Sequence, residues 1–552
     1  MTSKIQFGLA VALLVSSGIQ AQIPYAHPMA ATTKGIVVTC QPLAAQMGVE
    51  VLRNGGNAAD AYVATTLGEY VTAYGYTSLS GPLNLLYYDR NTNHSYYLNA
   101  GLNTVADPTG KFDPNNPVPG KSYVIGGAGA GLAALNKRFG RWPLSKVVQP
   151  AADLARTGFA ISPVYAWTIQ TRQPLFTKSA EWNAIFVPGG KPIAAGQTLI
   201  QTQLADTLTN FGKLGPDYLF KGRFASDLVQ TVQANGGKLT LHDLANYKVY
   251  WAEPLSTNYR GFEVQSGSYR SYGGLLLLSG LKAIEHDATL ADTHFSQDEG
   301  KFEEVLRTFL FSLEQATATY INFDKRIDKL QDQEALLSGS VPQSIWDSVK
   351  NPKLLAPWSQ AAGHDSCDTL VIDHDGNIVA SNHTINSFQW GDYGLMNDGV
   401  SLNSAAIQTG NAGPGERGLD PLMPVLIFQN GKPWAAAGFF DGSLETAGLE
   451  VLLNLMDYGM NPSDAIFTPR FGAPTGFNPV AIPLDPRFPP AWATDFAKKG
   501  IALQQPKNPD GSINMHAYVD TGDAMVIRID SETGMHYGSP SEVLQEAVAA
   551  EE

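Results

Sequence analysis

Apolar and polar positions near the start of the chain predict a buried strand followed by two helices. Residues 35–40 are an apolar run that begins at a glycine, which is typical of a buried strand. Residues 42–53 then place apolar side chains at i, i+4 and i+8, the spacing of one helix face. Gly55 supplies an end for this helix, and Asn57 is a capping residue for the next one.

Further strands are predicted by short apolar runs that flank turn residues. Residues 85–89 and 95–99 form one such pair, and residues 257–264 read as strand, turn and strand. The strongest hairpin signal is Asp375-Gly376, which lies between two apolar runs. We therefore expect a hairpin centred on these two residues, with its second strand over residues 378–385.

Helices dominate the middle of the chain, and strands return after it. Residues 127–330 are mostly patterned as helices, whereas residues 324–362 are polar, contain three prolines and predict an exposed connection. Additional elements are expected at residues 127–140 (helix), 144–158 (helix), 239–244 (capped turn), 425–428 (strand), 433–440 (strand), 443–458 (helix) and 524–529 (strand). Strands on both sides of a helical middle favour layers in which helices cover sheets.

The first strand of the Asp375-Gly376 hairpin carries a concentration of reactive side chains. Ser366, Cys367 and Thr369 each offer a nucleophile, and Asp365 and Asp368 add carboxylates. Alternation along the strand places Cys367 and Thr369 on one face, and Ser366 and Asp368 on the other. The residues alone do not rank the three nucleophiles.

Composition narrows the class of protein. The 552 residues include 44% hydrophobic and 16% charged residues, and the formal net charge is −14. Nucleic acid is excluded as a partner, because a nucleic-acid binder needs clustered lysine and arginine. Only Cys40 and Cys367 are cysteines, and their separation leaves open whether they pair. There is no Cys-x-x-Cys or His-x-x-x-His pattern, so no metal site and no other cofactor is predicted.

The N-terminal residues have the pattern of a secretory signal peptide. Lys4 is followed by the apolar residues 9–15 and by small or polar residues up to Ala21. This run is too short to span a bilayer, and no later segment has about 18 uninterrupted apolar residues. We therefore predict a signal peptide over residues 1–21 and an exported protein, periplasmic or secreted, with no membrane span.

Four blocks of sequence, in order, resemble the gamma-glutamyltransferase (gamma-glutamyltranspeptidase) family of N-terminal nucleophile hydrolases. Together they cover almost the whole chain after the predicted signal peptide. The blocks are residues 41–61, residues 138–159, residues 239–274 and residues 457–471.

This resemblance implies an α+β fold, a four-layer αββα sandwich. It also implies a precursor that cuts itself into a large subunit, residues 22–365, and a small subunit, residues 366–552, which form one intertwined unit. The register of residues 371–373 places Ser366 where the family usually has threonine, so the cut would fall between Asp365 and Ser366.

The same resemblance assigns roles around Ser366. It implies that Thr384 orients the nucleophile, that Asn386 contacts the substrate and that Gly442 belongs to the oxyanion hole. The chemistry also makes sense in its own right, because cleavage would free an α-amine on Ser366. Such an amine has a pKa of about 7.7–8.0 and can act as the base for the hydroxyl of the same residue.

The substrate-binding positions depart from the family pattern. The arginine that grips the glutamyl α-carboxylate is replaced by Gly101, and the paired serines by Asp420-Pro421. The acidic pair for the α-ammonium falls at Ser401-Leu402, and the first glycine of the oxyanion pair is Asp441. Loss of one partner of a buried charge pair costs roughly 2–5 kcal/mol of binding free energy.

Three functions are compatible with these residues. The first is an amidohydrolase or acylase that cleaves a small-molecule amide or peptide other than a standard γ-glutamyl compound. The second is a γ-glutamyl hydrolase or transpeptidase that acts on glutathione-like compounds with rewired recognition. The third is a non-catalytic binding protein that retains the fold.

Overall fold

Two seven-stranded sheets form the centre of the molecule, and every pair of neighbouring strands within them is antiparallel. The computed structural model describes residues 29–316, 328–351, 366–409, 412–474, 481–515, 517–541 and 546–552. Sheet A contains, in spatial order, β1 (Ala30–Thr32), β19 (His536–Pro540), β18 (Asp523–Ile529), β15 (Lys432–Phe440), β14 (Val425–Gln429), β9 (Phe262–Ser266) and β8 (Leu255–Tyr259). Sheet B contains β20 (Val548–Glu551), β2 (Ile36–Thr39), β10 (Ser366–Ile372), β11 (Ile378–Thr384), β3 (Leu83–Asp89), β4 (His94–Ala100) and β7 (Tyr250–Ala252).

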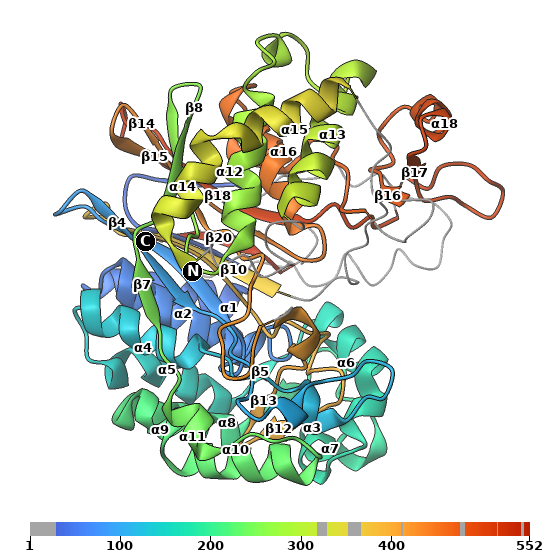
Figure 1. Cartoon of the computed structure of the whole chain (residues 1–552). Helices are drawn as coiled ribbons and strands as arrows, with labels where there is room; N and C mark the ends of the chain where they lie inside the picture. Colours follow the sequence, from blue (N-terminus) through green and yellow to red (C-terminus); the bar gives the residue numbers. More distant parts are fainter. Residues whose placement is uncertain are drawn as a thin grey trace, which may run out of the picture.

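Helices cover the outer face of each sheet (Figure 1). On the side of sheet B lie α1 (Pro42–Arg53), α2 (Ala58–Thr72), α3 (Pro119–Ser122), α4 (Ala128–Phe139), α5 (Leu144–Thr157), α6 (Pro163–Phe176), α7 (Ala180–Phe186), α8 (Thr202–Leu214), α9 (Pro216–Phe220), α10 (Arg223–Ala234) and α11 (Leu241–Ala245). On the side of sheet A lie α12 (Tyr272–Ile284), α13 (Glu299–Ala316), α14 (Leu330–Ser338), α15 (Ser340–Lys350) and α16 (Leu444–Met456). The remaining helices are α17 (Pro462–Phe467) and α18 (Ala491–Lys498), and the short strand pairs are β5 (Phe159–Ala160) with β6 (Thr198–Leu199), β12 (Met396–Asn397) with β13 (Val400–Ser401), and β16 (Ala481–Pro483) with β17 (Ala502–Gln504).

Three buried apolar clusters correspond to the three interfaces between these layers. One joins sheet B to its helices, a second joins sheet A to α12, α13 and α16, and a third lies between the two sheets. The third cluster includes Leu370 and Ile372 from β10 and Ala436 from β15, whereas Val371 belongs to the first. The fold is therefore a four-layer αββα sandwich, as the resemblance implied, with both faces of β10 buried.

The predicted hairpin at the centre of sheet B is present. Strands β10 and β11 pair from Ser366↔Thr384 to Ile372↔Ile378, and Gly376 adopts a φ of +87° in the turn. Asp373 accepts hydrogen bonds from the backbone N–H groups of Asn377, at 2.9 Å, and Ala58, at 2.8 Å. The turn is thereby fixed both internally and to the start of α2.

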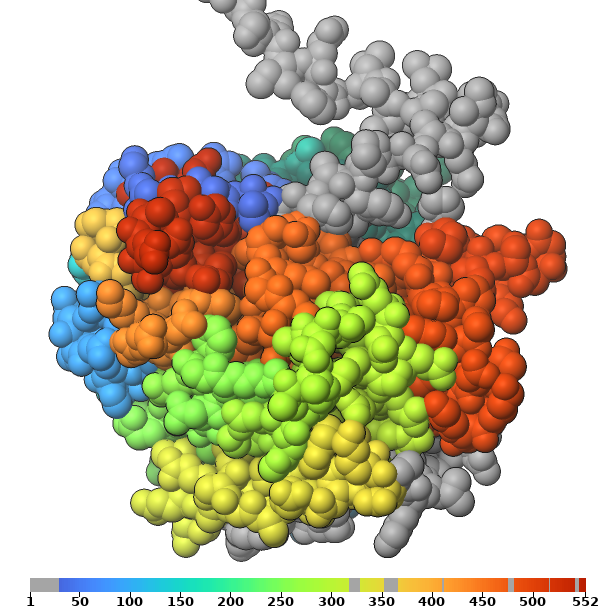
Figure 2. Space-filling model, turned by 90° about the horizontal axis from the view of Figure 1, so that it is seen from above, coloured from blue at the N-terminus to red at the C-terminus, as the bar shows by residue number. Residues whose placement is uncertain are grey.

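Segments from both sides of Ser366 are mixed throughout the molecule. Each sheet contains strands that precede Ser366 and strands that follow it. Figure 2 shows the same mixing at the surface, where green and yellow segments lie directly beside orange and red ones. Burial of apolar surface across these layers would hold the two parts of the chain together without any covalent bond between them.

Two features differ from, or add to, the sequence-based expectations. Within the predicted connection of residues 324–362, residues 330–350 form helix α14, which packs on α12, and helix α15, which packs on α12 and α13 through Ile345 and Val349. Cys40 and Cys367 form a disulfide bond, a pairing that the sequence left open. The predicted signal peptide and Asp365 lie outside the described residues. Among the residues that are described, no helix combines the length and apolar character that crossing a bilayer requires.

Candidate functional site

Ser366 is the first residue of β10, a central strand of sheet B that lies between β2 and β11. Its partner in the strand register is Thr384, the last residue of β11. Ser366 is 9% exposed and contributes to the wall of a pocket. The residue proposed from the sequence as nucleophile therefore lies at a sheet end that a small molecule can approach.

Thr384 lies opposite Ser366 in the strand register, and Asn386 contacts Thr384. The backbone N–H of Asn386 donates to Thr384 Oγ1 at 2.7 Å, and Asn386 has a φ of +58°, a conformation that asparagine tolerates better than most residues. A Cβ atom on Gly81 would lie 1.7 Å from the backbone oxygen of Thr384. Only glycine therefore fits at that position of the loop that precedes β3, and the close packing fixes the end of β11.

The pocket next to Ser366 is mainly lined by uncharged groups. Its lining residues are Cys40, Gln41, Ala73, Tyr76, Val164, Tyr165, Ser366, Cys367 and Glu546. Glu546 is the acid among them, and it accepts a hydrogen bond from Gln41 Nε2 at 2.5 Å. Burial raises the pKa of Glu546. A lining with little polar surface suits a largely apolar group.

A buried polar cluster lies on the side of β10 that faces α2. Glu69 of α2 accepts a hydrogen bond from Thr369 Oγ1 at 2.9 Å and makes close contacts with Thr39 and with His383 Nε2. Glu69 and His383 are both 0% exposed. Since His383 is the register partner of Cys367, the cluster joins α2 to both strands of the hairpin one residue away from Ser366.

Two of the predicted substrate-binding positions, Gly101 and Asp420, are neighbours. A Cβ atom on Gly101 would lie 3.1 Å from Asp420 Oδ2. Asp420 is 4% exposed and accepts hydrogen bonds from Asn84 Nδ2, at 2.8 Å, and from the backbone N–H of Leu422, at 3.2 Å. Burial raises the pKa of Asp420 to about 7. An acid thus occupies a position where the family resemblance implies groups that bind a carboxylate.

Leu402 lies elsewhere and faces the interior. Its side chain is 1% exposed and belongs to the apolar cluster between sheet B and its helices. The adjacent Ser401 uses its backbone oxygen to accept a hydrogen bond from Ser78 Oγ at 2.6 Å. Leu402 consequently presents no polar group to a ligand.

Asp441 and Gly442 connect β15 to the start of α16. Asp441 has a φ of +71°, and its carboxylate accepts hydrogen bonds from the Gly442 N–H, at 2.8 Å, and from the Tyr518 hydroxyl, at 2.9 Å. Burial, followed by the charge of Asp520, raises the pKa of Asp441 to about 6. The N–H group that would donate to an oxyanion is therefore already bound to the side chain of the preceding residue.

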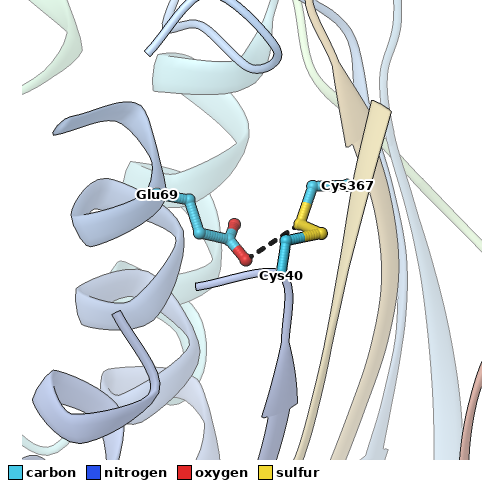
Figure 3. A group of neighbouring side chains, drawn as sticks. All are labelled: Cys40, Glu69 and Cys367. Atoms are coloured by element: carbon cyan, nitrogen blue, oxygen red, sulfur yellow. Dashed lines mark hydrogen bonds between the residues drawn. A yellow bond between two sulfur atoms is a disulfide. The ribbon is translucent and has the colours of Figure 1, made fainter. Parts of the chain in front are cut away.

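Cys40, Glu69 and Cys367 have potential metal-ligand atoms within 4.8 Å of one another (Figure 3). The two sulfur atoms are bonded to each other, so neither is a thiolate. Because thiolates are the cysteine form that binds metal ions, these three residues do not fit an ion in the oxidised protein.

Sequence reasoning did not identify the Glu69–His383 cluster or Glu546. A sequence signal for Glu69 does exist, since it is the one charged residue after Asp60 in a segment of mostly small and apolar residues that forms a fully buried helix. Glu546 has no comparable signal, because only the fold brings the C-terminal segment next to Ser366.

Comparisons with known proteins agree with this arrangement. A family model described as gamma-glutamyltranspeptidase matches residues 44–531. The glutathione hydrolase proenzyme of Escherichia coli is 30% identical over 495 residues, which cover 83% of each chain. The acylase ACY 1 proenzyme of Pseudomonas sp. strain SE83 is 27% identical and covers 89% of this chain and 91% of its own. The crystal structure of cephalosporin acylase from Bacillus halodurans superposes with a TM-score of 0.81 at 21% identity, covering 97% of this chain and 99% of the other.

Proposed function

We propose, since the chain belongs to the gamma-glutamyltranspeptidase family, that it is an amidohydrolase whose nucleophile is Ser366. The proposed enzyme forms when the peptide bond between Asp365 and Ser366 is cut. The observation that carries this proposal is the position of Ser366, which begins a central strand, pairs with Thr384 and borders a pocket. Proenzymes among the similar proteins support a precursor that matures by cleavage.

The cut supplies the base that the hydroxyl needs. A serine hydroxyl is a weak nucleophile until a group accepts its proton, and the freed α-amine of the same residue is one. In this mechanism the hydroxyl oxygen attacks the amide carbonyl, and the amine of the product leaves with a proton. Water then hydrolyses the acyl–serine ester. Thr384 orients the hydroxyl, Asn386 contacts the substrate, and the N–H of Gly442 stabilises the oxyanion once it is released from Asp441.

Side chains around the site support an acyl group without an amino-acid head. Gly101 offers no cation, the carboxylate of Asp420 repels a second carboxylate above its pKa of about 7, and Leu402, which is buried elsewhere, offers no acid for an α-ammonium. The lining of the Ser366 pocket is mainly uncharged. We therefore place hydrolysis of a small non-γ-glutamyl amide first, in line with the similarity to an acylase.

A glutathione-like substrate is the second candidate, and one contact favours it. The Arg417 Cδ atom would lie 3.4 Å from a Cβ atom on Gly101, so a guanidinium comes from another segment to this corner of the site. That guanidinium donates to Asn103 Oδ1 and to the backbone oxygen of Lys248, both at 2.6 Å. A substrate carboxylate would therefore have to compete with these acceptors.

Export to the periplasm or the medium is part of the proposal. The N-terminal pattern of a positive residue, an apolar run and small residues supports it. The Cys40–Cys367 disulfide also supports it, because such bonds persist in oxidising compartments. The mature protein would then consist of a large subunit, residues 22–365, and a small subunit, residues 366–552.

The test compares wild type with Ser366→Ala and Ser366→Thr on two substrate sets. One set contains N-acyl amides with uncharged acyl groups, and the other contains γ-glutamyl amides, including glutathione. We expect Ser366→Ala to lose activity by on the order of 10³-fold or more, and Ser366→Thr to retain it. Because the charges that bind a glutamyl group in the family are missing here, we expect wild type to prefer the N-acyl amides by about 30-fold or more.

Each other result points to a different function. Preference for glutathione over every N-acyl amide would support the second candidate. Equal rates for wild type and Ser366→Ala on both sets, with each protein folded, would leave a non-catalytic binding protein.

A further inference from the structure

The disulfide bond joins the two segments that lie on either side of the proposed cut. Cys40 directly follows β2, and Cys367 is the second residue of β10, the adjacent strand of sheet B. Their Cα atoms are 6.0 Å apart although 327 positions separate them in sequence. Figure 3 shows the bond running between the two strands, close to Glu69 of α2.

We infer that the Cys40–Cys367 bond is an intersubunit crosslink that keeps the large and small subunits covalently joined after maturation. This inference rests on the proposed cleavage before Ser366. Hydrolysis of that peptide bond consumes one water, leaves a carboxylate on Asp365 and an amine on Ser366, and transfers no electrons. The disulfide is therefore unchanged by the cut, but it then connects two separate chains.

The crosslink lies where it can also hold the N-terminus of the small subunit in place. New chain ends fray unless they are tied down, and Ser366 would be such an end. Cys367 is the residue immediately after it, and its sulfur is bonded to the neighbouring strand. The crosslink thus anchors the N-terminus of the small subunit within one residue of the nucleophile, and both cysteines line the Ser366 pocket.

The surroundings protect the bond in the folded protein. Both cysteines are 0% exposed, so an external thiol that enters the Ser366 pocket meets no exposed surface of either residue. Glu69 Oε1 lies 3.1 Å from Cys367 Sγ, and because a disulfide sulfur carries no proton, this is a contact and not a hydrogen bond. On reduction, a thiolate at Cys367 would face this carboxylate, which disfavours the form that exchanges with other disulfides.

The experiment is intact-mass analysis and gel electrophoresis of denatured wild-type protein, alkylated first so that thiols cannot exchange. Without reductant we expect one species with the mass of both subunits together. With reductant we expect two species, the smaller beginning at Ser366. Dithiothreitol applied to the native protein, followed by alkylation and then denaturation, should leave most of the crosslink intact.

Variants separate a missing crosslink from a missing cut. Cys40→Ser should mature and give two separate chains without reductant. Ser366→Ala should remain one chain under both conditions, and it should gain two alkyl groups only when it is reduced before alkylation. Two separate wild-type chains without reductant would overturn the crosslink while supporting the cut. A single wild-type chain under reducing conditions would overturn the cut, and therefore the crosslink between subunits, while the alkyl count would still report the disulfide.

Discussion

The hairpin around Ser366 and the positions proposed for substrate binding, Gly101, Asp420 and Asp441, differ in how closely they follow the family pattern. In the hairpin, Ser366 and Thr384 pair in register, and tight packing by Gly81 fixes the end of β11. At the proposed binding positions, an acid with a pKa raised to about 7 lies against Gly101, and a second acid, Asp441, accepts the N–H of Gly442, the proposed oxyanion donor. The groups that would perform the chemistry are in place, whereas the charges that would select a glutamyl group are not.

This difference indicates that the reaction and the choice of substrate are separable in this fold. The proposed nucleophile, Ser366, depends on the central strands of sheet B, which are buried on both faces and cannot change without loss of packing. The recognition side chains come from strand ends and loops, where substitution is tolerated more easily. A change of substrate with retention of the mechanism is the outcome that this arrangement favours.

The largest expected effect concerns the buried Glu69–His383 cluster, which packs against the hairpin that carries Ser366. Glu69→Ala would leave His383, which is 0% exposed, without its carboxylate partner. Loss of one member of a buried pair costs about 3–5 kcal/mol, so we expect that decrease in the free energy of unfolding. Urea denaturation measures it, and Glu50→Ala is the control because the Glu50–Arg53 ion pair is exposed. A change below about 1 kcal/mol for Glu69→Ala would show that the cluster does not hold the hairpin.

The next effect is the contribution of Asp420 to the pH dependence of stability. Burial raises the pKa of Asp420 to about 7, above its unfolded value of about 3.9, so the folded state binds the extra proton between these values. Stability contributed by the protonated acid is therefore lost as the pH rises through 7. From pH 5 to pH 8 we expect wild type to lose about 3 kcal/mol more than Asp420→Asn.

Chemical denaturation at both pH values provides the measurement. Glu334→Gln is the matched control, because this acid is exposed on α14 and should leave the wild-type pH dependence unchanged. If wild type and Asp420→Asn lose the same free energy of unfolding between pH 5 and pH 8, Asp420 is ionised in the folded protein at low pH. The contrast between the hairpin and the proposed binding positions would then weaken.

The smallest effect concerns the oxyanion corner. Ionised Asp441 competes for the N–H of Gly442, and its charge opposes a developing oxyanion. Its pKa of about 6 means that this opposition is present above pH 6 and is lost below it. We expect the rate ratio of Asp441→Gly to wild type to rise to about tenfold, or ~1.4 kcal/mol, as the pH passes from 5 to 8.

Steady-state rates on one N-acyl amide across this pH range provide the test. Asp441→Asn removes the charge but keeps a side-chain acceptor, so it should show a smaller rise. If the ratio of the Asp441→Gly rate to the wild-type rate does not change with pH, the charge of Asp441 does not affect the reaction.

Local sequence patterns predicted much of the fold because turns and caps are encoded locally. The Asp375-Gly376 turn, the Asn57 cap of α2 and the Thr240 cap of α11 all occur as expected. Residues 330–350 were predicted wrongly, because polar composition and Pro342 masked an amphipathic pattern. Proline is compatible with the first turn of α15, where no intrahelical N–H bond is lost.

Contacts between segments that are far apart in the sequence could not be predicted from local sequence patterns. The pairing of Cys40 with Cys367 and the contact of Glu69 with His383 join segments separated by 327 and 314 positions. Their geometry follows from the register of sheet B and the packing of α2 on it. The family resemblance identified Ser366 and Thr384 as neighbours, but it did not reveal the pocket between Tyr76, Tyr165 and Glu546.

The most direct test of the central claim is N-terminal sequencing combined with intact mass of the purified wild-type protein under denaturing and reducing conditions. Our account predicts two chains, the smaller one beginning Ser366-Cys367-Asp368, and a single uncut chain for Ser366→Ala. A wild-type protein that remains one uncut chain and still hydrolyses amides would contradict it.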